Sequence, residues 1–365
     1  MLTSSGNLYL SKAELINVQG FENLTIRFTG KDNQVLMYSL FLGNNSAGKT
    51  SFLRCLALGM CDETGASGLI EELQSPFIRQ GEKEAVISIE LIASNGRYRI
   101  VTKVKRINTS ERIRQHYYSL SEAGAIIEIQ PEDFPWDNLF VCGYGAGRIL
   151  GEITKTYEKY RVPDAIGTLF RYDQPMQHPE LSLHRLVMAT RKQVGEHAVE
   201  QQILQRFLAL IGELFMLTAQ DRIELTEKGI QIINAEKAFP LLASGDGYKN
   251  TAAWVLDMVT WKILAARSLE PTEMSGIVLL DEVEQHLHPN WQRHLVRLMR
   301  QQFPKIQWIA TTHSPISAAG TADLPDDEYQ LLRFDREPQS FIQLVEVPSL
   351  RGLKADQVLT STAFL

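Results

Sequence analysis

Cysteine is scarce in this chain: its 365 residues include only Cys55, Cys61 and Cys142, and no two of them form a CxxC pair. An odd number of scattered thiols argues against a disulfide framework and against a zinc site, and it favours reduced thiols in a cytoplasmic protein. Long apolar runs are also missing, since no stretch of about 18 apolar residues occurs and the first residues hold no continuous apolar segment. We therefore expect neither a transmembrane helix nor a secretory signal, and no membrane partner.

Repetitive patterns are absent as well. The chain has no internal repeat and no low-complexity linker, and no stretch sustains the apolar heptads of a coiled coil, which excludes a long rod. It also lacks a nuclease constellation of its own, because it has neither an HNH-type grouping of histidine and asparagine nor an acidic extension after its last motif. If nucleic acid is cut, we expect a partner to cut it.

An excess of basic residues is missing too: 37 Lys and Arg against 43 Asp and Glu give a net charge of −6. General attraction to nucleic acid is therefore excluded, and DNA binding would need a local patch. One candidate is the predicted strand 97–105 with the residues that follow it, where Glu111 is the only acid that offsets the basic side chains. These are Arg97, Arg99, Lys103, Lys105, Arg106, Arg112 and Arg114. A DNA contact and a solvated outer face explain this patch equally well.

A second basic face is predicted on the helix after Pro289, where Arg293, Arg297 and Arg300 lie opposite an apolar face. Here a solvated surface is the better explanation.

What the chain does contain is a glycine-rich segment, GNNSAGKT at 43–50, directly after the apolar run 38–42 that predicts a buried strand. This is the P-loop pattern, in which glycines let backbone N–H groups surround a phosphate at a helix N-terminus. Lys49 would reach the β- and γ-phosphates of ATP, and Thr50 would supply a hydroxyl to Mg²⁺. The predicted nucleotide-binding residues are Gly43, Asn44, Asn45, Ser46, Ala47, Gly48, Lys49, Thr50 and Ser51.

Two further apolar strands end in polar residues suited to phosphate chemistry. Residues 277–280 predict a strand inside a parallel sheet, and Asp281 after it is placed to hold Mg²⁺, directly or through water. Glu282 would polarise the attacking water. Strand 306–310 leads to His313, which could hydrogen-bond the γ-phosphate and so distinguish ATP from ADP. The predicted catalytic residues are thus Glu282, His313 and Lys49.

The segment LASGDG at 242–247 precedes a predicted helix over 248–266. A small hydroxyl and two glycines at a helix N-terminus can form an anion site, although in isolation an ordinary N-cap is the commoner explanation.

These four motifs, in their order along the chain, resemble the ABC-type ATPase heads of the RecF, SMC and Rad50 group. The resemblance is strongest to compact bacterial ATPases of anti-phage systems of the Septu (PtuA-type) and retron kind, and it runs nearly end to end. Its most specific phrases are DEVEQHLHP at 281–289 and RGLKADQVLTSTAF at 351–364. The resemblance implies that Ser244, Gly245 and Gly247 bind the γ-phosphate of an ATP held by a second subunit. It therefore implies a homodimer or higher even oligomer joined by ATP, and a separately encoded nuclease effector.

The chain departs from ABC transporter heads in the spacing of its motifs, which favours the RecF-like branch, and from the common pattern of these heads in one further segment. Ser244 and Asp281 are 37 residues apart (281 − 244), longer than is usual in transporter heads. The segment GYGAGR at 143–148, where a glutamine is expected, has none. Its Arg148 would contact either phosphate or the other subunit, or else be a loop arginine bonded to carbonyls. A metal site at Glu284, His286 and His288 is disfavoured because it would crowd the nucleotide.

We therefore predict an α/β fold: a P-loop ABC-type ATPase head with a parallel core sheet, an antiparallel β subdomain and a short helical insertion in place of a coiled coil. The expected division is 1–148 for the nucleotide-binding lobe, 149–241 for the insertion, and 242–365 for the remaining motifs and a tail. The predicted function is an ATPase, with ATP and Mg²⁺ as cofactors, that controls a nuclease effector. The alternative is a RecF-like DNA-binding repair ATPase without a nuclease.

Overall fold

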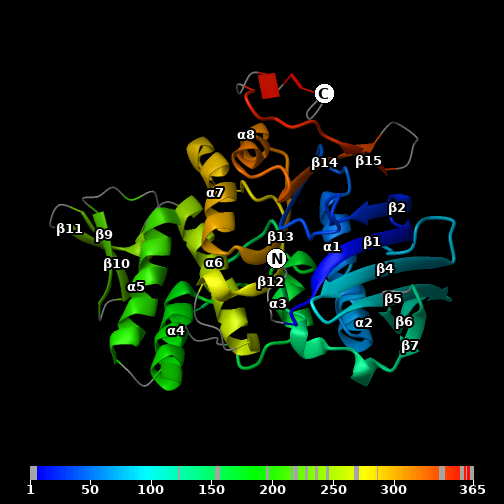
Figure 1. The fold of residues 1–365 in the computed structure, drawn as a ribbon, viewed down its shortest axis with the longest axis horizontal. Coiled ribbons are helices and arrows are strands. Elements are labelled where there is room, and N and C mark those ends of the chain that lie inside the picture. Colours follow the sequence, from blue (N-terminus) through cyan, green and yellow to red (C-terminus); the bar gives the residue numbers. More distant parts are fainter. Residues whose placement is uncertain are drawn as a thin grey trace.

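A computed structural model gives the fold of the chain (Figure 1). It describes residues 6–121, 124–152, 157–194, 197–214, 217, 221–226, 229–234, 237–243, 246–266, 271–285, 287–336, 342–353, 357–358 and 360–361. Among these residues, no helix combines the length and the apolar character needed to cross a membrane.

A six-stranded, mainly parallel sheet forms the centre of the molecule. Its strands run in the order β15 (Ile342–Glu346), β14 (Tyr329–Arg336), β3 (Tyr38–Leu42), β13 (Lys305–Thr312), β12 (Ser275–Leu280) and β8 (Val141–Tyr144). All neighbours are parallel except β14 and β15. Every residue of β3, β8 and β12 is buried, which is what continuous apolar runs predict for strands covered on both faces. The carboxyl ends of β3, β12 and β13 therefore meet at one edge.

The second sheet is antiparallel throughout. Its order is β2 (Phe21–Arg27), β1 (Tyr9–Val18), β4 (Glu84–Ala93), β5 (Gly96–Ile107), β6 (Ser110–Leu120) and β7 (Ile126–Ile129). The hairpin between β4 and β5 is where the sequence predicts it, but its two turn residues are Ser94 and Asn95, because Gly96 already pairs with Ala93 as the first residue of β5.

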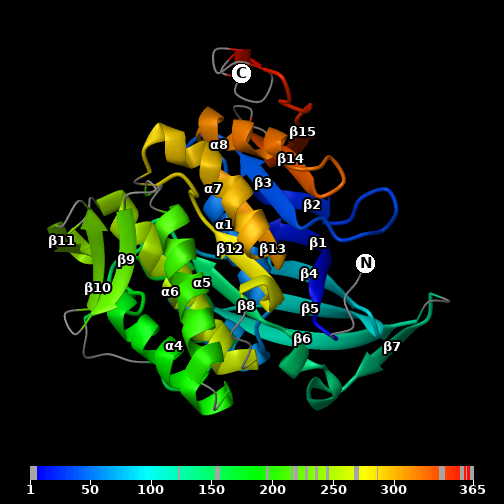
Figure 2. The ribbon, with the colours of Figure 1, turned by 60° about the vertical axis from the view of Figure 1, so that its left-hand side comes forward.

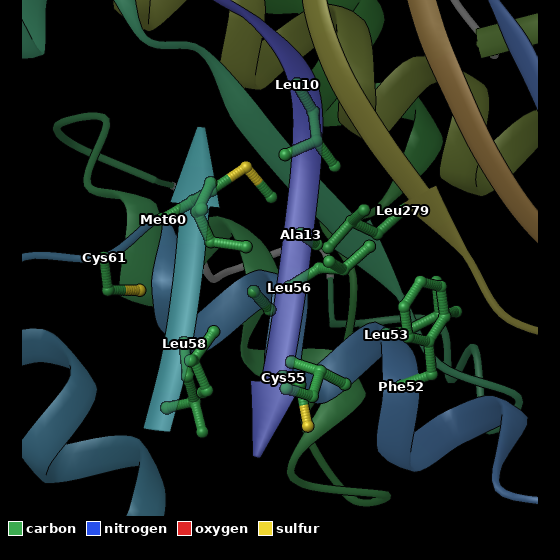
Figure 3. Packing of buried hydrophobic residues seen from close by; sticks show 14 of the residues in the cluster. Leu10, Ala13, Phe52, Leu53, Cys55, Leu56, Leu58, Met60, Cys61 and Leu279 are labelled. Carbon is green, nitrogen blue, oxygen red and sulfur yellow. The ribbon is translucent and has the colours of Figure 1, made fainter. Parts of the chain in front are cut away.

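Helix α1 (Lys49–Gly59) lies between the two sheets. Its apolar side chains pack with Leu10 and Ala13 of β1 and with Leu279 of β12 in one buried cluster (Figure 3). The same cluster takes up Phe41, whereas its neighbours Leu40 and Leu42 point to the opposite face of the central sheet. The P-loop helix is thus fixed from both sides.

The opposite face of the central sheet is covered by α6 (Asp246–Ala266) and α7 (Pro289–Gln302) (Figure 2). Beyond α6 lie α4 (Pro179–Val194) and α5 (His197–Leu214), which contact a small antiparallel sheet (Figure 1). That sheet consists of β9 (Asp221–Thr226), β10 (Gly229–Asn234) and β11 (Lys237–Pro240). The remaining helices are α2 (Glu63–Glu71), α3 (Val162–Ile166) and α8 (Pro315–Gly320).

The predicted fold class is confirmed in its main parts, the parallel core sheet with helices and the antiparallel sheet. The segment 149–241, expected to be helical, also contains the sheet β9–β11. These strands are only four to six residues long, whereas the helical pattern over residues 183–216 is much longer and dominates the segment. The division of the chain at residues 148 and 241 stays a prediction.

Candidate nucleotide site

The P-loop joins the end of β3 to the start of α1, and its backbone is held in an unusual conformation. Ser46 and Gly48 both have positive φ, 65° and 94°. The Lys49 side chain folds back over the loop, and its Nζ donates hydrogen bonds to the carbonyls of Gly43 (2.7 Å) and Asn44 (3.1 Å). Burial lowers the pKa of Lys49, and the neighbouring carboxylates Asp281, Glu282 and Glu284 oppose that shift. The ammonium of Lys49 therefore closes the P-loop and lies near three carboxylates.

Asp281 connects the P-loop to two strands of the central sheet. The Thr50 Oγ1 donates to Asp281 Oδ2 at 2.6 Å, and Thr311 Oγ1 at the end of β13 donates to Oδ1 at 2.5 Å. The Asp281 N–H donates to the carbonyl of Tyr144 at the end of β8. Asp281 is 1% exposed, so three elements position one buried carboxylate at the edge where the parallel strands end.

Glu282 has a backbone conformation that residues other than glycine rarely adopt, with φ of 46°. Its N–H donates to Thr311 Oγ1 at 2.9 Å, and its carbonyl accepts from Arg148 Nη2 at 2.7 Å. The same Arg148 nitrogen also donates to the carbonyl of Asp281. Both peptide groups of the Glu282 turn are therefore held by side chains from other segments.

Arg148 is 4% exposed and has a positive φ of its own, 36°. Burial lowers its pKa to about 10, and the nearby acids Asp281, Glu284 and Glu282 oppose the shift. The expectation of a loop arginine bonded to carbonyls is confirmed for Arg148. The carbonyls are those of Asp281 and Glu282, the two acids of the predicted site. No sequence pattern identifies those acceptors, because they are backbone atoms 133 and 134 positions away.

Glu284 was missed as a site residue. Its carboxylate is buried and accepts hydrogen bonds from Thr312 and His313 at the end of β13. His288, another member of the disfavoured metal grouping, caps α7 instead, and its ring accepts from the N–H of Asn290. His286 lies outside the described residues. Among the described residues, no three His, Cys, Asp or Glu side chains gather as a metal site.

Ser244 and Gly245, expected at the γ-phosphate of a second subunit, lie outside the described residues. Gly247 stands in the first turn of α6, the second residue of that helix.

The basic strand is less basic than its sequence suggests, which corrects the expectation that Glu111 alone offsets it. Arg106 does pair with Glu111, at 3.3 Å, but three more of the seven basic residues also form ion pairs. Those pairs are Arg99 with Glu90, Lys105 with Glu84 and Arg114 with Glu63, at 2.6 to 3.1 Å. The glutamates come from β4 and α2, neighbours that the strand's own sequence cannot reveal.

The basic face of α7 is also different from the prediction. Arg293 and Arg297 are exposed, as a solvated face requires, but Arg300 is buried and its guanidinium donates to Glu328 at 2.7 Å. Arg293 pairs with Asp323. Neither face is an uncompensated patch of positive charge.

Comparison with solved structures places the fold. The SMC head domain from Thermotoga maritima superposes with a TM-score of 0.52 at 14% identity, over 93% of this chain and 98% of that one. An SMC head bound to the C-terminal winged-helix domain of ScpA gives a TM-score of 0.53 at 13% identity, with the same coverage. The chain therefore has the fold of an SMC head, with a P-loop segment between β3 and α1.

Comparison of the sequence with known proteins shows which ATPases the chain resembles. Residues 12–134 match a family described as "AAA domain", and residues 261–318 match one described as "AAA domain, putative AbiEii toxin, Type IV TA system". The Septu protein PtuA of Bacillus mycoides (strain KBAB4) is 26% identical over 98% of this chain. The Retron Ec83 probable ATPase of Escherichia coli is 22% identical over 85% of it. The resemblance to PtuA-type and retron ATPases is thus confirmed.

The alignments cover unequal parts of these relatives. The matched region is 45% of the PtuA chain and 69% of the retron ATPase. This chain thus spans less than half the length of that PtuA.

Proposed function

We propose that the chain binds ATP with Mg²⁺ and hydrolyses it to ADP and phosphate. The observation that supports this most directly is the hydrogen bond between Thr50 of the P-loop and Asp281 after β12, which brings the two motifs to one point. The proposed nucleotide contacts are residues 43–51, with Lys49 reaching the β- and γ-phosphates.

Thr50 and Asp281 are the proposed magnesium ligands. Their atoms Oγ1 and Oδ2 lie 2.6 Å apart, and hydroxyl and carboxylate oxygens are donors that Mg²⁺ accepts, with water and phosphate oxygens completing its shell. The donor set therefore fits the ion. When bound there, Mg²⁺ would neutralise charge on the phosphate oxygens.

Glu282 is the proposed general base. Its main chain is fixed by Thr311 and Arg148, so its carboxylate extends from a rigid turn beside the proposed magnesium ligand Asp281. A fixed carboxylate can orient a water for in-line attack on the γ-phosphate and accept its proton, a contribution of about 10²–10⁴-fold in rate. His313, next to the same edge, is the proposed γ-phosphate contact.

ATP is further proposed to join two copies of the chain. Ser244, Gly245 and Gly247 would contact the γ-phosphate on the P-loop of the opposite subunit, which gives a homodimer or a higher even oligomer. Two observations support this: α6 begins at Asp246, directly after Ser244 and Gly245, and the fold is that of an SMC head. A helix N-terminus favours an anion there.

The partner is proposed from the relatives alone. Similarity to a Septu protein PtuA and to a retron probable ATPase supports a role in anti-phage defence, with the ATPase cycle controlling a separately encoded effector, a nuclease. The alternative is a RecF-like DNA-binding ATPase that needs no effector. The ion pairs of the basic strand weaken that alternative.

The ATPase proposal is tested by two substitutions. Lys49→Ala should abolish ATP binding, whereas Glu282→Gln should bind ATP, hydrolyse it poorly and accumulate as a dimer in light scattering. Equal dimerisation of both variants in ATP would contradict the ATP-linked dimer.

The effector proposal needs a separate experiment. Glu282→Gln would be expressed from its native locus, purified in ATP, and analysed by mass spectrometry, with Lys49→Ala as the matched control. A stoichiometric nuclease bound to the first variant only is the expected result. Nucleic acid without a protein partner would favour the DNA-binding alternative.

A further inference from the structure

Glu284 is a carboxylate that the proposed ATPase chemistry does not yet use, although it lies in the same turn as Asp281 and Glu282. The residue is 5% exposed. Burial of a carboxylate is unfavourable unless hydrogen bonds satisfy its oxygens, so its donors indicate what the residue is for.

All of the described donors to Glu284 come from two consecutive residues at the end of β13. Thr312 Oγ1 donates to Oε2 at 2.6 Å. The N–H of His313 donates to Oε1 at 2.7 Å, and the ring Nδ1 of His313 lies 2.8 Å from the same oxygen. One buried carboxylate thus fixes both the backbone and the ring of a histidine whose side chain is 52% exposed.

The other side of this segment is fixed as well. Ser314 N–H donates to Thr312 Oγ1 at 2.9 Å, and Ser314 Oγ donates to Gln292 on α7 at 2.5 Å. Ser314 also caps α8. The backbone on either side of His313 therefore has little freedom, and the 2.8 Å contact between Nδ1 and Glu284 Oε1 constrains how the ring is turned.

A carboxylate only accepts hydrogen bonds, so the ring nitrogen that contacts Glu284 carries a proton. This leaves Nε2 as the nitrogen that can meet a ligand. A doubly protonated imidazole donates from both nitrogens and can join a carboxylate on one side to a phosphate oxygen on the other.

We propose that Glu284 is a positioning residue for γ-phosphate recognition: it fixes the ring orientation and the Nδ1–H form of His313, so that Nε2 is presented to the nucleotide. This inference rests on the proposed function, in which His313 contacts the γ-phosphate. It assigns to the third acid of the DEVE segment a role separate from those of Asp281 and Glu282.

The test measures affinities for ATP and ADP separately, by isothermal titration calorimetry with Mg²⁺, for the wild type, Glu284→Gln, His313→Ala and the double variant. Glu284→Gln should weaken ATP binding about tenfold or more and leave ADP binding unchanged, because ADP lacks the γ-phosphate. In the His313→Ala background the same substitution should add nothing. Additive losses, or equal losses for ATP and ADP, would overturn the proposal.

The control is Glu90→Gln, which changes another buried, hydrogen-bonded glutamate, on the antiparallel sheet away from the P-loop. It should leave both affinities unchanged. If His313→Ala itself has no effect on ATP binding, the γ-phosphate role of His313 in the proposed function fails. If His313→Ala weakens ATP binding but Glu284→Gln does not, only the present inference fails.

A second measurement reads the tautomer in the wild-type protein itself. In the wild-type protein labelled with ¹⁵N-histidine, the nitrogen shifts of the neutral ring at alkaline pH report which nitrogen carries the proton. The structure assigns the Nδ1–H form to His313, whose resonance is identified by its loss in His313→Ala. The Nε2–H form would overturn the proposal.

Discussion

The hydroxyl of Thr50 lies 2.6 Å from the carboxylate of Asp281, although 231 positions separate the two residues in the chain. Thr50 is in the first turn of α1 and Asp281 directly follows β12. The Thr50 hydroxyl and the Asp281 carboxylate, which a hydrogen bond joins at the P-loop, are arranged as two adjacent ligands for a hard cation.

The first prediction concerns this pair. Thr50→Val keeps the shape of the side chain but removes the hydroxyl, so the gain in ATP affinity on adding Mg²⁺ should fall by at least about tenfold. Calorimetry with Mg²⁺ and with EDTA measures that gain. Thr50→Ser, which retains the hydroxyl, should behave like the wild type. A full Mg²⁺ effect in Thr50→Val would remove Thr50 from the proposed metal site.

The second prediction concerns Arg148. One guanidinium nitrogen of Arg148 contacts the carbonyls of Asp281 and Glu282. Arg148→Lys replaces the planar guanidinium by a single ammonium, so the turn that holds Glu282 should loosen. We therefore expect kcat to fall about 10- to 100-fold. The Kd for ATP should change little, because Arg148 is proposed to position the base. Steady-state ATPase assays and calorimetry separate the two quantities. Arg171→Lys, at an exposed arginine that pairs with Glu72, is the control. If affinity falls as far as rate, Arg148 acts on the nucleotide instead.

The third prediction compares two glycines. Gly48 has φ of 94°, and a Cβ added there would lie 2.7 Å from Ile342 Cδ1. Gly48→Ala should therefore lower the free energy of unfolding by about 1–3 kcal/mol. Gly68 lies in α2, and a Cβ added there meets nothing within 4 Å, so Gly68→Ala should raise stability by up to about 1 kcal/mol. Urea unfolding measures both. Equal effects would show that the P-loop conformation is not strained.

The fourth prediction concerns the buried Asp257 of α6. Its carboxylate accepts hydrogen bonds from Tyr144, Tyr157 and the N–H of Gln177, at 2.7 to 2.9 Å. Burial nevertheless raises its pKa from 3.8 to about 6, and the hydrogen bonds oppose the shift. The native state therefore binds the proton more tightly than the unfolded state, and stability from this group is present below pH 3.8 and is lost as pH rises through 6.

The loss is measured against Asp257→Asn, which does not titrate. Between pH 5 and 7 the wild type should lose about 1 kcal/mol of unfolding free energy relative to this variant, out of about 3 kcal/mol in total. Comparing the two proteins removes the contribution of histidines that titrate in the same range. A difference independent of pH would show that Asp257 does not titrate between these values.

The arrangement of the central sheet was readable from the sequence because each motif follows an uninterrupted apolar run. Such runs predict strands buried on both faces, and buried parallel strands end at a common edge. That is why Lys49, Asp281 and His313 could be brought to one edge without a structure. The β4–β5 hairpin was predictable for a similar local reason, the Asn95-Gly96 pair between two strand patterns, although the turn itself lies one residue earlier, at Ser94 and Asn95.

Charge on the surface could not be read in the same way. The basic strand was expected to be almost uncompensated, yet four of its seven basic residues pair with glutamates, three of them on neighbouring elements. The ladder between β4 and β5 brings Glu84 and Glu90 opposite Lys105 and Arg99. Strand register exists only in the folded sheet, so a count of charges along one strand overestimates the positive electrostatic potential at its surface.

The sequence by itself determined the class of this protein, because a P-loop, paired acids and a histidine after apolar strands are local patterns that few other folds combine. The tertiary structure alone decided how those residues are held. Arg148 is hydrogen-bonded to two backbone carbonyls, and Glu284 accepts from a backbone amide and contacts a ring nitrogen, all in segments that are distant in the chain. Backbone acceptors and donors are the same at every position, so only the packing that brings the strand ends together selects which of them a buried side chain meets.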